Sequence, residues 1–227
     1  MAPFGASRAG LMSVAEDDIP DSVVDNFERG NLDPYIESGG GSFSVQQSIV
    51  WDDRFESAYA LAGTHDDDHN IYSGVGDGLE NYPERGDEIR LYTYIDDALG
   101  DSRFGFGFGA SSDPGASRDE GYIAYITTTE SPQELFLRKE DSDLEQSGAI
   151  SPPDEEWFEW RIEWTDPTIT VSLHENWDEE SEEFTDKITS ISADDDEFDS
   201  GGIYFYLNHS GTQTTYFDQC WVWERGI

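Results

Sequence analysis

Aromatic side chains that alternate with charged ones in one short segment constrain the fold of this chain more than any other feature. Residues 157–164 read WFEWRIEW. Successive side chains of a β-strand point to opposite faces of the sheet, so this segment would form a strand with one apolar row and one mostly charged row. The apolar row is Phe158, Trp160, Ile162 and Trp164. We therefore expect a strand buried on one side and facing water on the other.

The same alternation recurs from residue 23 to the end of the chain. It predicts about eleven to thirteen strands, separated by clusters of Gly, Asp, Asn, Ser and Pro. The clearest candidates are residues 43–47, 57–62, 88–95, 103–109, 121–126, 134–138, 157–164, 169–174, 203–207 and 215–222, with a weaker one around residues 188–191. No stretch of useful length has the period of a helix. The expected fold is all-β: a two-sheet antiparallel β-sandwich of the jelly-roll type.

The charge balance excludes some classes of partner. The chain carries 51 acidic residues against 12 basic ones, a formal net charge of −39. Nucleic-acid phosphates are bound by clustered Lys and Arg, so we expect no nucleic-acid partner. The charge also disfavours anionic membranes, and no apolar run approaches the ~20 residues of a membrane-spanning helix. Aromatic residues make up 14% of the chain, which argues against the disorder that high charge otherwise favours.

Lysine is nearly absent, with only Lys139 and Lys187 in the chain. This acidic, lysine-poor composition is typical of proteins from halophilic archaea and their viruses. At molar salt the Debye length falls to ~3 Å, so a like-charged surface no longer repels itself strongly, and excess carboxylate keeps the protein soluble. An ordinary acidic protein is the alternative.

Residues 1–22 differ from the rest, and we expect an extended N-terminal arm there, followed by one domain at residues 23–227. Residues 1–12 are small and mildly apolar, and an acidic turn follows them. Two placements stay open: contact with a neighbouring subunit, or packing as a tail on the same domain. The arm lacks the long apolar stretch of a secretory signal, so no signal peptide is predicted.

Two further patterns concern the core. Cys220, the only cysteine, alternates with aromatic residues in 216–222, which predicts a buried thiol rather than a nucleophile. Gly105 and Gly107 separate three phenylalanines in the strand candidate at 103–109. Glycine leaves one face of a strand bare, which permits close approach of another backbone or a ligand; strand curvature is the alternative.

Several segments together resemble one family of jelly-roll domains. They are residues 24–32, 41–45, 57–61, 157–164, 201–206 and 216–218. This pattern of strand residues and turns, spread over residues 23–224, is similar to the concanavalin A-like lectin and glucanase (LamG-type) domains that halophilic archaea and their tailed viruses carry. The resemblance implies a concanavalin A-like jelly roll. Galactose-binding-type jelly rolls, which share the Phe-Glu and Phe-Asp ends, stay open as the alternative family.

The resemblance also implies a structural calcium ion that ties the first strand to the last. Glu28 and Asp218, each of which follows a phenylalanine, match that position, and Asp25 is adjacent. Ca²⁺ takes six to eight oxygen ligands, so these three carboxylates are the expected metal ligands. The alternative site is the acidic loop at residues 65–70, which would otherwise be a solvated turn.

Glycan binding would use aromatic rings against the apolar faces of sugars and polar groups that hold the hydroxyls. The main candidates are Tyr92, Tyr94, Tyr122 and Arg138. Further candidates are Arg90, Tyr125, Tyr72, Tyr82 and Trp177. Each of them can instead be a core or subunit-contact residue, since the sequence does not decide which row of a strand is buried.

No catalytic residue is predicted. Glucanases of the resembling fold carry a Glu-x-Asp-x-x-Glu strand, and in retaining enzymes the two carboxyl groups lie about 5–5.5 Å apart. Here Glu159 and Glu163 flank an arginine instead. We therefore expect a non-enzymatic protein, and a glycoside hydrolase of the same fold is the least favoured alternative.

These features lead to one functional hypothesis. The acidic surface, the arm and the resemblance indicate a structural or adhesion protein on the capsid or tail of a halophilic archaeal virus particle, assembled in the host cytoplasm. Its expected partners are further copies of itself, other virion proteins reached through the arm, and glycans of the host surface. A cellular carbohydrate-binding module is the alternative.

Overall fold

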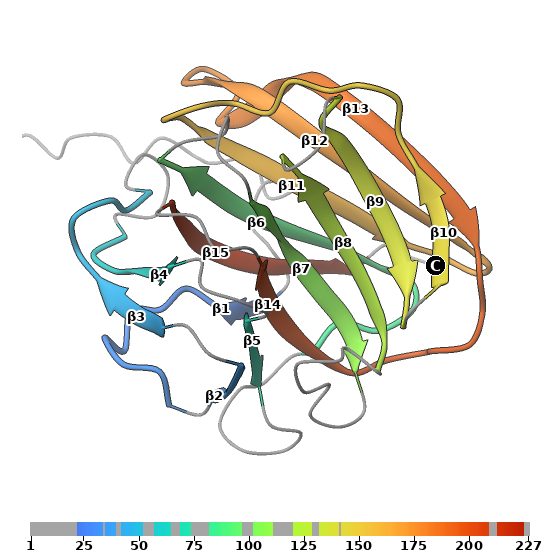
Figure 1. Cartoon of the computed structure of the whole chain (residues 1–227), viewed down its shortest axis with the longest axis horizontal. Helices are drawn as coiled ribbons and strands as arrows, with labels where there is room; N and C mark the ends of the chain where they lie inside the picture. The colour runs from blue at the N-terminus through green and yellow to red at the C-terminus, as the bar shows by residue number, and fades with distance from the viewer. Residues whose placement is uncertain are drawn as a thin grey trace, which may run out of the picture.

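Two β-sheets packed face to face make up this computed structural model (Figure 1). The structure describes residues 22–33, 35–39, 42–51, 57–64, 69–73, 82–96, 102–110, 120–128, 132–140, 142–208 and 213–224. No helix occurs in these ranges, and so none there could cross a membrane. The predicted all-β, two-sheet antiparallel sandwich is confirmed. The arm expected at residues 1–22 lies outside the described ranges, apart from Ser22.

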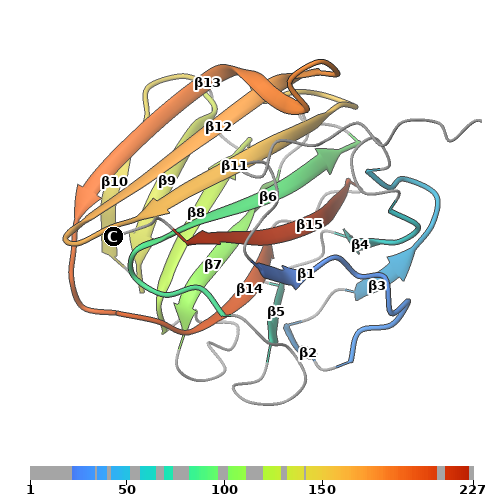
Figure 2. The same ribbon diagram turned by 180° about the vertical axis from the view of Figure 1, so that it is seen from behind.

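The first sheet has eight strands in the order β13–β12–β11–β6–β15–β4–β3, and β1 also pairs with β15. Their bounds are β1 (Ser22–Asp25), β3 (Ser42–Gln46), β4 (Ala60–Thr64), β6 (Asp87–Ile95), β11 (Trp157–Trp164), β12 (Thr168–Asp178), β13 (Glu183–Asp194) and β15 (Thr214–Glu224). Figure 2 shows this sheet in front, with the second sheet behind it.

The second sheet has seven strands in the order β10–β9–β8–β7–β14–β5–β2. Their bounds are β2 (Tyr35–Gly39), β5 (His69–Ser73), β7 (Arg103–Ala110), β8 (Tyr122–Thr127), β9 (Glu134–Lys139), β10 (Ser142–Gln146) and β14 (Gly202–Asn208). The sequence pattern had indicated neither β2 nor β10, which are edge strands of this sheet.

The core lies between the two sheets and contains the predicted apolar row of β11, in which all four side chains are fully buried. That row meets the phenylalanines of β7: ring centroids of Phe104 and Phe158 are 6.3 Å apart, and those of Phe108 and Trp164 are 5.1 Å apart. Burial of one row of β11 obliges its other row, which includes Arg161, to point away from the core.

Close approach explains the glycines of β7, and the approaching atoms belong to the protein itself. A Cβ on Gly105 would lie 2.1 Å from the carbonyl oxygen of Ala124, and one on Gly107 would lie 2.1 Å from the ring of Tyr204. Any larger residue would collide with the neighbouring strand or with that ring. Cys220 is fully buried, as predicted.

A β-bulge in β15 decides which of its side chains face outward. The register shifts between Asp218 and Trp221, and Gln219 has a φ of 53°. The extra residue lets both Phe217 and Cys220 join the core. Asp218 and Trp221 consequently face the outer side of the eight-stranded sheet, where Trp221 packs with other aromatic residues.

Candidate functional site

The outer face of the eight-stranded sheet is hollowed over β6, β11, β12 and β13. The hollow has a volume of about 260 Å³, and its lining is polar throughout: Glu88, Arg90, Arg161, Glu163, Thr170, Ser172, His174, Lys187 and Ser190. Those on β6, β11 and β12 belong to the rows opposite the core row. The alternation that points one row of each strand into the core therefore points the lining residues of these three strands to the outer face.

Strand pairing sets the lining in rows across the sheet. In the central row Arg90 lies opposite Arg161, Arg161 opposite Ser172, and Ser172 opposite Ser190. In the row on one side Glu88 lies opposite Glu163. Like charges directly opposite each other weaken a sheet, so the hollow contains two unfavourable pairs side by side, one of each sign.

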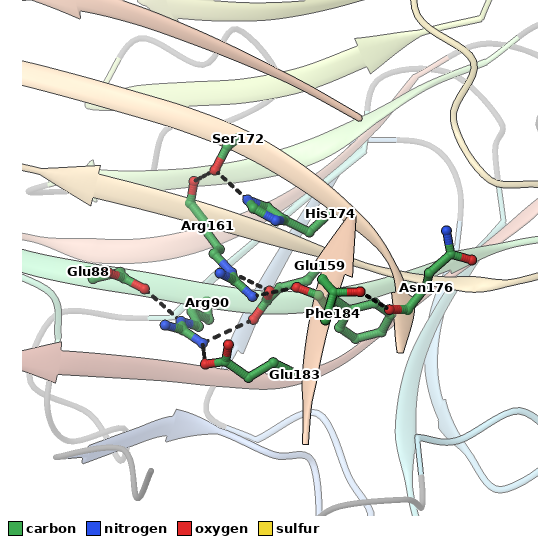
Figure 3. Close-up of polar contacts among 10 residues, drawn as sticks. Glu88, Arg90, Glu159, Arg161, Ser172, His174, Asn176, Glu183 and Phe184 are labelled. Atoms are coloured by element: carbon green, nitrogen blue, oxygen red, sulfur yellow. Dashed lines mark hydrogen bonds and ion pairs between the residues drawn. The ribbon is translucent and has the colours of Figure 1, made fainter. Parts of the chain in front are cut away.

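Counterions on the same strands hold this arrangement together (Figure 3). Arg90 donates from Nε to Glu88 at 2.6 Å, and Arg161 donates from Nε to Glu159. Glu159 lies between the two guanidinium groups, 3.6 Å from Nη1 of Arg90, and its side chain is only 1% exposed. Burial raises the pKa of Glu159, and both arginines oppose that effect. The carboxylate is thus an internal counterion rather than a group open to a ligand.

His174 lies beside this row and remains uncharged at neutral pH. Burial is the main cause of a pKa lowered to about 4, and the nearby cations Arg161, Lys187 and Arg90 contribute to the decrease. Its Nε2 is 3.1 Å from the hydroxyl of Ser172, while its buried Nδ1 has no hydrogen-bond partner in the described part of the chain. The three cations thus add to the effect of burial, and the charge of Glu88 opposes it.

Aromatic side chains cover the sheet beside the hollow. This outer aromatic cluster comprises Trp51, Tyr92, Phe184 and Trp221, with Trp157, Trp177 and Trp223 packed against it. The guanidinium of Arg90 stacks on the ring of Trp223, 4.4 Å from its centroid. The hollow is thereby flanked by indole rings, and three of these tryptophans are only partly buried.

The β12–β13 hairpin bends over this face. The register of the hairpin shifts between Leu173 and His174, and Asn176 has a φ of 62°. These irregularities bring Phe184 into the aromatic cluster, where its carbonyl oxygen accepts a hydrogen bond of 2.8 Å from Nη2 of Arg161 (Figure 3). Arg161 thus anchors the hairpin as well as lining the hollow.

The structure separates the four main glycan candidates. Tyr92 and Tyr94 lie on this outer face; Tyr92 is 1% exposed within the cluster, whereas Tyr94 is half-buried beside Trp157. Tyr122 lies on the other sheet and is a core residue, 0% exposed, because its row of β8 faces inward. Arg138 is also on the other sheet, paired with Asp143 at 2.6 Å.

The further candidates divide in the same way. Arg90 lines the hollow, and Trp177 belongs to the outer aromatic cluster. Tyr125 is buried on the seven-stranded sheet, Tyr82 is half-buried outside the hollow, and the side chain of Tyr72 lies outside the described residues. The pattern missed Arg161, Lys187 and Trp223. The alternation of β11 could have identified Arg161, since it lies in the row opposite the core.

Of the three expected metal ligands, Asp25 is engaged elsewhere. Its carboxylate accepts from both amino groups of Arg29, at 2.6 and 2.8 Å, and from the hydroxyl of Tyr35 at 2.5 Å. It also accepts from the backbone N–H of Phe27. These partners neutralise the charge and fill the oxygens, so Asp25 does not suit a cation.

Glu28 and Asp218 do come together. The hydroxyl of Ser57 lies 3.1 Å from Oε1 of Glu28 and also hydrogen-bonds Asp218. Asp218 is 0% exposed, and burial raises its pKa to about 7, with the charge of Glu28 contributing. Within the described ranges no three Asp, Glu, His or Cys residues gather as a metal site. The alternative loop at 65–70 lies outside the described residues, except for the backbone of its last two.

Comparison with solved structures places the fold. A galectin-like protein of unknown function from Bacillus subtilis matches with a TM-score of 0.59 and 11% identity, over 91% of this chain and 97% of its own. The exoplasmic domain of VIP36, in a form bound to Ca²⁺ and Man3GlcNAc, matches at 0.55 and 9% identity, over 82% and 84%. A legume lectin-like domain from Entamoeba histolytica matches at 0.53 and 12% identity, over 85% and 90%.

The chain has a galectin-like and legume-lectin-like β-sandwich fold. An enzyme has a similar fold too: an endo-β-galactosidase from Clostridium perfringens matches at a TM-score of 0.52 and 11% identity, over 87% of this chain and 61% of its own. No protein-family model matches the sequence, and none of the curated proteins is similar to it. At such identities the likeness shows the fold alone, which agrees with the concanavalin A-like resemblance of the sequence.

Proposed function

We propose that this protein binds carbohydrate, and that the hollow on the outer face of the eight-stranded sheet is the binding site. The observation that carries the proposal is the combination found there: a cavity lined by charged and hydroxyl side chains, flanked by partly buried tryptophans. Protein sites for sugars need polar groups that fix hydroxyls and aromatic faces that cover the C–H side of the ring. The lectin-like folds of the neighbours support the same function.

The size and composition of the hollow indicate a short ligand segment. Its volume of about 260 Å³ is just below the range of small-molecule pockets, about 300–1,000 Å³. The hydroxyls of Thr170, Ser172 and Ser190 and the guanidinium groups supply the hydrogen bonds that one or two sugar residues would need. We propose that the end of a glycan, rather than the middle of a long chain, occupies it.

A glycosidase is less well supported, although one neighbour is an endo-β-galactosidase. Hydrolysis with retention needs two accessible carboxyl groups about 5–5.5 Å apart. Glu159 and Glu163 point to the same face of β11, but the carboxylate of Glu159 is buried and paired with Arg90 and Arg161. A carboxylate used in this way has no oxygen free to attack a substrate.

A structural calcium ion is a second part of the proposal, with fewer ligands than the sequence indicated. Ser57 has one hydroxyl proton, yet its oxygen lies within 3.1 Å of both Glu28 Oε1 and the carbonyl oxygen of Tyr59, and it also contacts Asp218. Backbone N–H groups of Ala58 and Tyr59 donate to Glu28 Oε1, and those of Trp51 and Gln219 donate to Asp218. The support for the ion is therefore the closeness of two carboxylates that share Ser57, whose charge Ca²⁺ would neutralise. We propose that Glu28, Asp218, Ser57 and Tyr59 would hold it, with Asp25 excluded.

The biological setting stays a prediction. The proposal of a virion adhesion protein that works at high salt draws on the net charge of −39 and on the scarcity of lysine. Light scattering in molar NaCl, on the full chain and on a chain lacking residues 1–22, tests it. A defined oligomer that the truncation dissolves supports assembly through the arm. A monomer in both samples favours a cellular carbohydrate-binding module instead.

A glycan array followed by calorimetry tests the binding site. Ser190→Trp, on the edge strand β13, should fill the hollow and abolish binding. Ser142→Trp is the matched control, because it places the same ring at an exposed position of β10, the edge strand of the other sheet. Equal binding by both variants would place the site elsewhere, and binding to no glycan by the unmodified protein would reject the proposal.

A further inference from the structure

The geometry of the hollow points to the class of sugar, an inference that rests on the proposed carbohydrate function. We propose that the ligand carries an anionic group, a carboxylate or a sulfate ester, and that Arg161 and Lys187 bind this group beside the ion-paired Arg90. The two sources of negative charge share one chemistry, an oxyanion that accepts several hydrogen bonds from cationic donors.

The local balance of charge is the first support. The chain has 51 acidic and 12 basic residues, so acids outnumber bases about fourfold. In the lining the order is reversed: three bases, Arg90, Arg161 and Lys187, stand against two acids, Glu88 and Glu163. A solvated face of this protein would be expected to follow its overall composition. Two carboxylates beside the lining, Glu159 and Glu183, each lie 3.6 Å from Nη1 of Arg90, and Glu159 also pairs with Arg161. The positive charge that remains for an anion is therefore that of Lys187, together with the donors that Arg161 keeps, and it attracts anions to a recessed surface.

The arrangement of donors is the second support. Arg90, Arg161, Ser172 and Ser190 form a continuous cross-strand row over four strands, about 14 Å long at the usual strand spacing of about 4.8 Å. Every member of this row can donate hydrogen bonds. Two guanidinium groups placed opposite each other weaken the sheet, and a ligand anion would relieve the repulsion between them.

Donors remain available in that row. Arg161 uses Nε for Glu159 and Nη2 for the carbonyl of Phe184, and its Nη1 makes no hydrogen bond to the described residues. Lys187, one of only two lysines in the chain, is exposed and forms no ion pair with any described carboxylate. It lies opposite His174 across the β12–β13 pair, at the edge of the hollow where an incoming anion would meet it.

The acids of the lining do not cancel this charge. Glu88 is paired with Arg90 at 2.6 Å, so its charge is offset locally. Glu163 lies opposite Glu88, in the row next to the arginines, and would repel an anion bound in the central row. The site therefore contains one residue whose neutralisation should strengthen anion binding and one, Lys187, whose neutralisation should weaken it.

Calorimetry with two matched ligand pairs tests the inference. One pair is a galacturonic acid tetrasaccharide and its methyl ester; the other is a sulfated galactan oligosaccharide and its desulfated form. The variants are Lys187→Gln, Glu163→Gln and Lys139→Gln, the last removing the only other lysine, which lies on the seven-stranded sheet. All three positions are at least partly exposed, and unfolding curves confirm that each variant folds.

We expect at least one acidic ligand to bind tenfold or more tightly than its neutral partner, as one charge-assisted hydrogen bond of about 1.5–3 kcal/mol provides. Lys187→Gln should reduce that ratio, Glu163→Gln should increase it, and Lys139→Gln should leave it unchanged. A higher affinity for the acidic member of the galacturonic acid pair indicates that the site binds a carboxylate. A higher affinity for the acidic member of the galactan pair indicates a sulfate ester. Equal affinity for acidic and neutral partners would overturn the inference and leave carbohydrate binding intact. Failure of all four ligands to bind, together with a blank glycan array, would reject the proposed function itself.

Discussion

Asp218 should make the protein less stable as the pH rises from 5 to 8 when calcium is absent. Its carboxyl is fully buried, and burial raises its pKa from 3.8 to about 7. The native state then holds a proton that the unfolded chain releases above pH 3.8. Stability from this proton is complete below pH 3.8, declines as the pH increases, and is lost once the pH passes about 7. At 1.36 kcal/mol per pH unit, the loss is about 4 kcal/mol in all.

Comparison with Asp218→Asn isolates this effect. Both carboxylate oxygens of Asp218 accept backbone N–H groups, from Gln219 and from Trp51, so an amide would oppose one of these donors with its own NH₂. That cost does not depend on pH. The informative quantity is therefore how much more steeply the free energy of unfolding falls with pH in wild type than in the variant. Urea unfolding followed by tryptophan fluorescence, with a chelator and fixed salt, should show the wild-type free energy of unfolding falling by about 3 kcal/mol more than that of the variant between pH 5 and 8.

A control of opposite sign strengthens the test. Asp195 has a lowered pKa because Lys139 and the hydroxyl of Tyr122 donate to it, which outweighs its burial. Its contribution is present at neutral pH and is lost as the pH falls through its native pKa. Asp195→Asn should therefore lose most stability, relative to wild type, at neutral pH. Parallel pH profiles for wild type and Asp218→Asn would refute the reasoning about the buried proton.

Four further predictions follow from the same structure. At pH 8, millimolar Ca²⁺ should raise the melting temperature of wild type but not of Asp218→Asn or Glu28→Gln, by calorimetry; an equal shift in all three would place the ion elsewhere. Melting temperature should increase with NaCl concentration, because salt screens the repulsion within a surface of net charge −39, and a flat profile would contradict that account. The imidazole of His174 should titrate near pH 4 by NMR, and a midpoint near 6.5 would show that the imidazole is neither buried nor surrounded by cations as described. Trp160→Ala should cost about 3–5 kcal/mol of unfolding free energy, whereas a cost under about 1 kcal/mol would mean that the core row of β11 is not packed as described.

The two-sheet architecture could be predicted from the sequence because it follows from a local pattern, the alternation of apolar and polar residues along each strand. Strand alternation assigned the buried row of β11. The burial predicted for Cys220 is also confirmed, but it results from the bulge in β15, which puts Cys220 on the same face as Phe217. Alternation failed where the backbone departs from it. The bulge at Gln219 reverses the faces beyond Asp218, and nothing in residues 216–222 marks the extra residue, since Gln is not a residue that a positive φ usually selects.

The candidate site was harder to predict because its members meet only through strand pairing. Tyr92 and Tyr94 were placed on the relevant face, but Tyr122 was not, since either row of β8 could have been buried: Tyr122, Ala124 and Ile126 on one side, Ile123 and Tyr125 on the other. Both rows are in fact buried, so apolar content alone could not separate them. Trp51 reaches the cluster from a segment with no strand pattern at all.

The register between β6 and β11 shows whether charge pairing or apolar burial sets the geometry of the hollow. A slip of two residues would keep every side chain on its own face. It would place Glu159 opposite Arg90, and Arg161 opposite Glu88, turning like-charge pairs into opposite ones. Each such pair is worth about 0.2–1 kcal/mol, whereas fully burying one large apolar side chain is worth about 1.5–3 kcal/mol.

The observed register sets Trp160 opposite Leu91 and Ile162 opposite Ile89, all of them buried. A slip would shift these core residues against the opposite sheet, where the ring of Trp164 contacts Phe108. The apolar core therefore imposes the juxtaposition of Arg90 and Arg161, and the buried carboxylate of Glu159 makes it tolerable. Both arginines also have roles in the fold, since Arg161 anchors the β12–β13 hairpin through the carbonyl oxygen of Phe184 and Arg90 stacks on Trp223. The pairing of two arginines in a chain so short of positive charge agrees with the proposed binding of an anion, beyond the roles of both side chains in the fold.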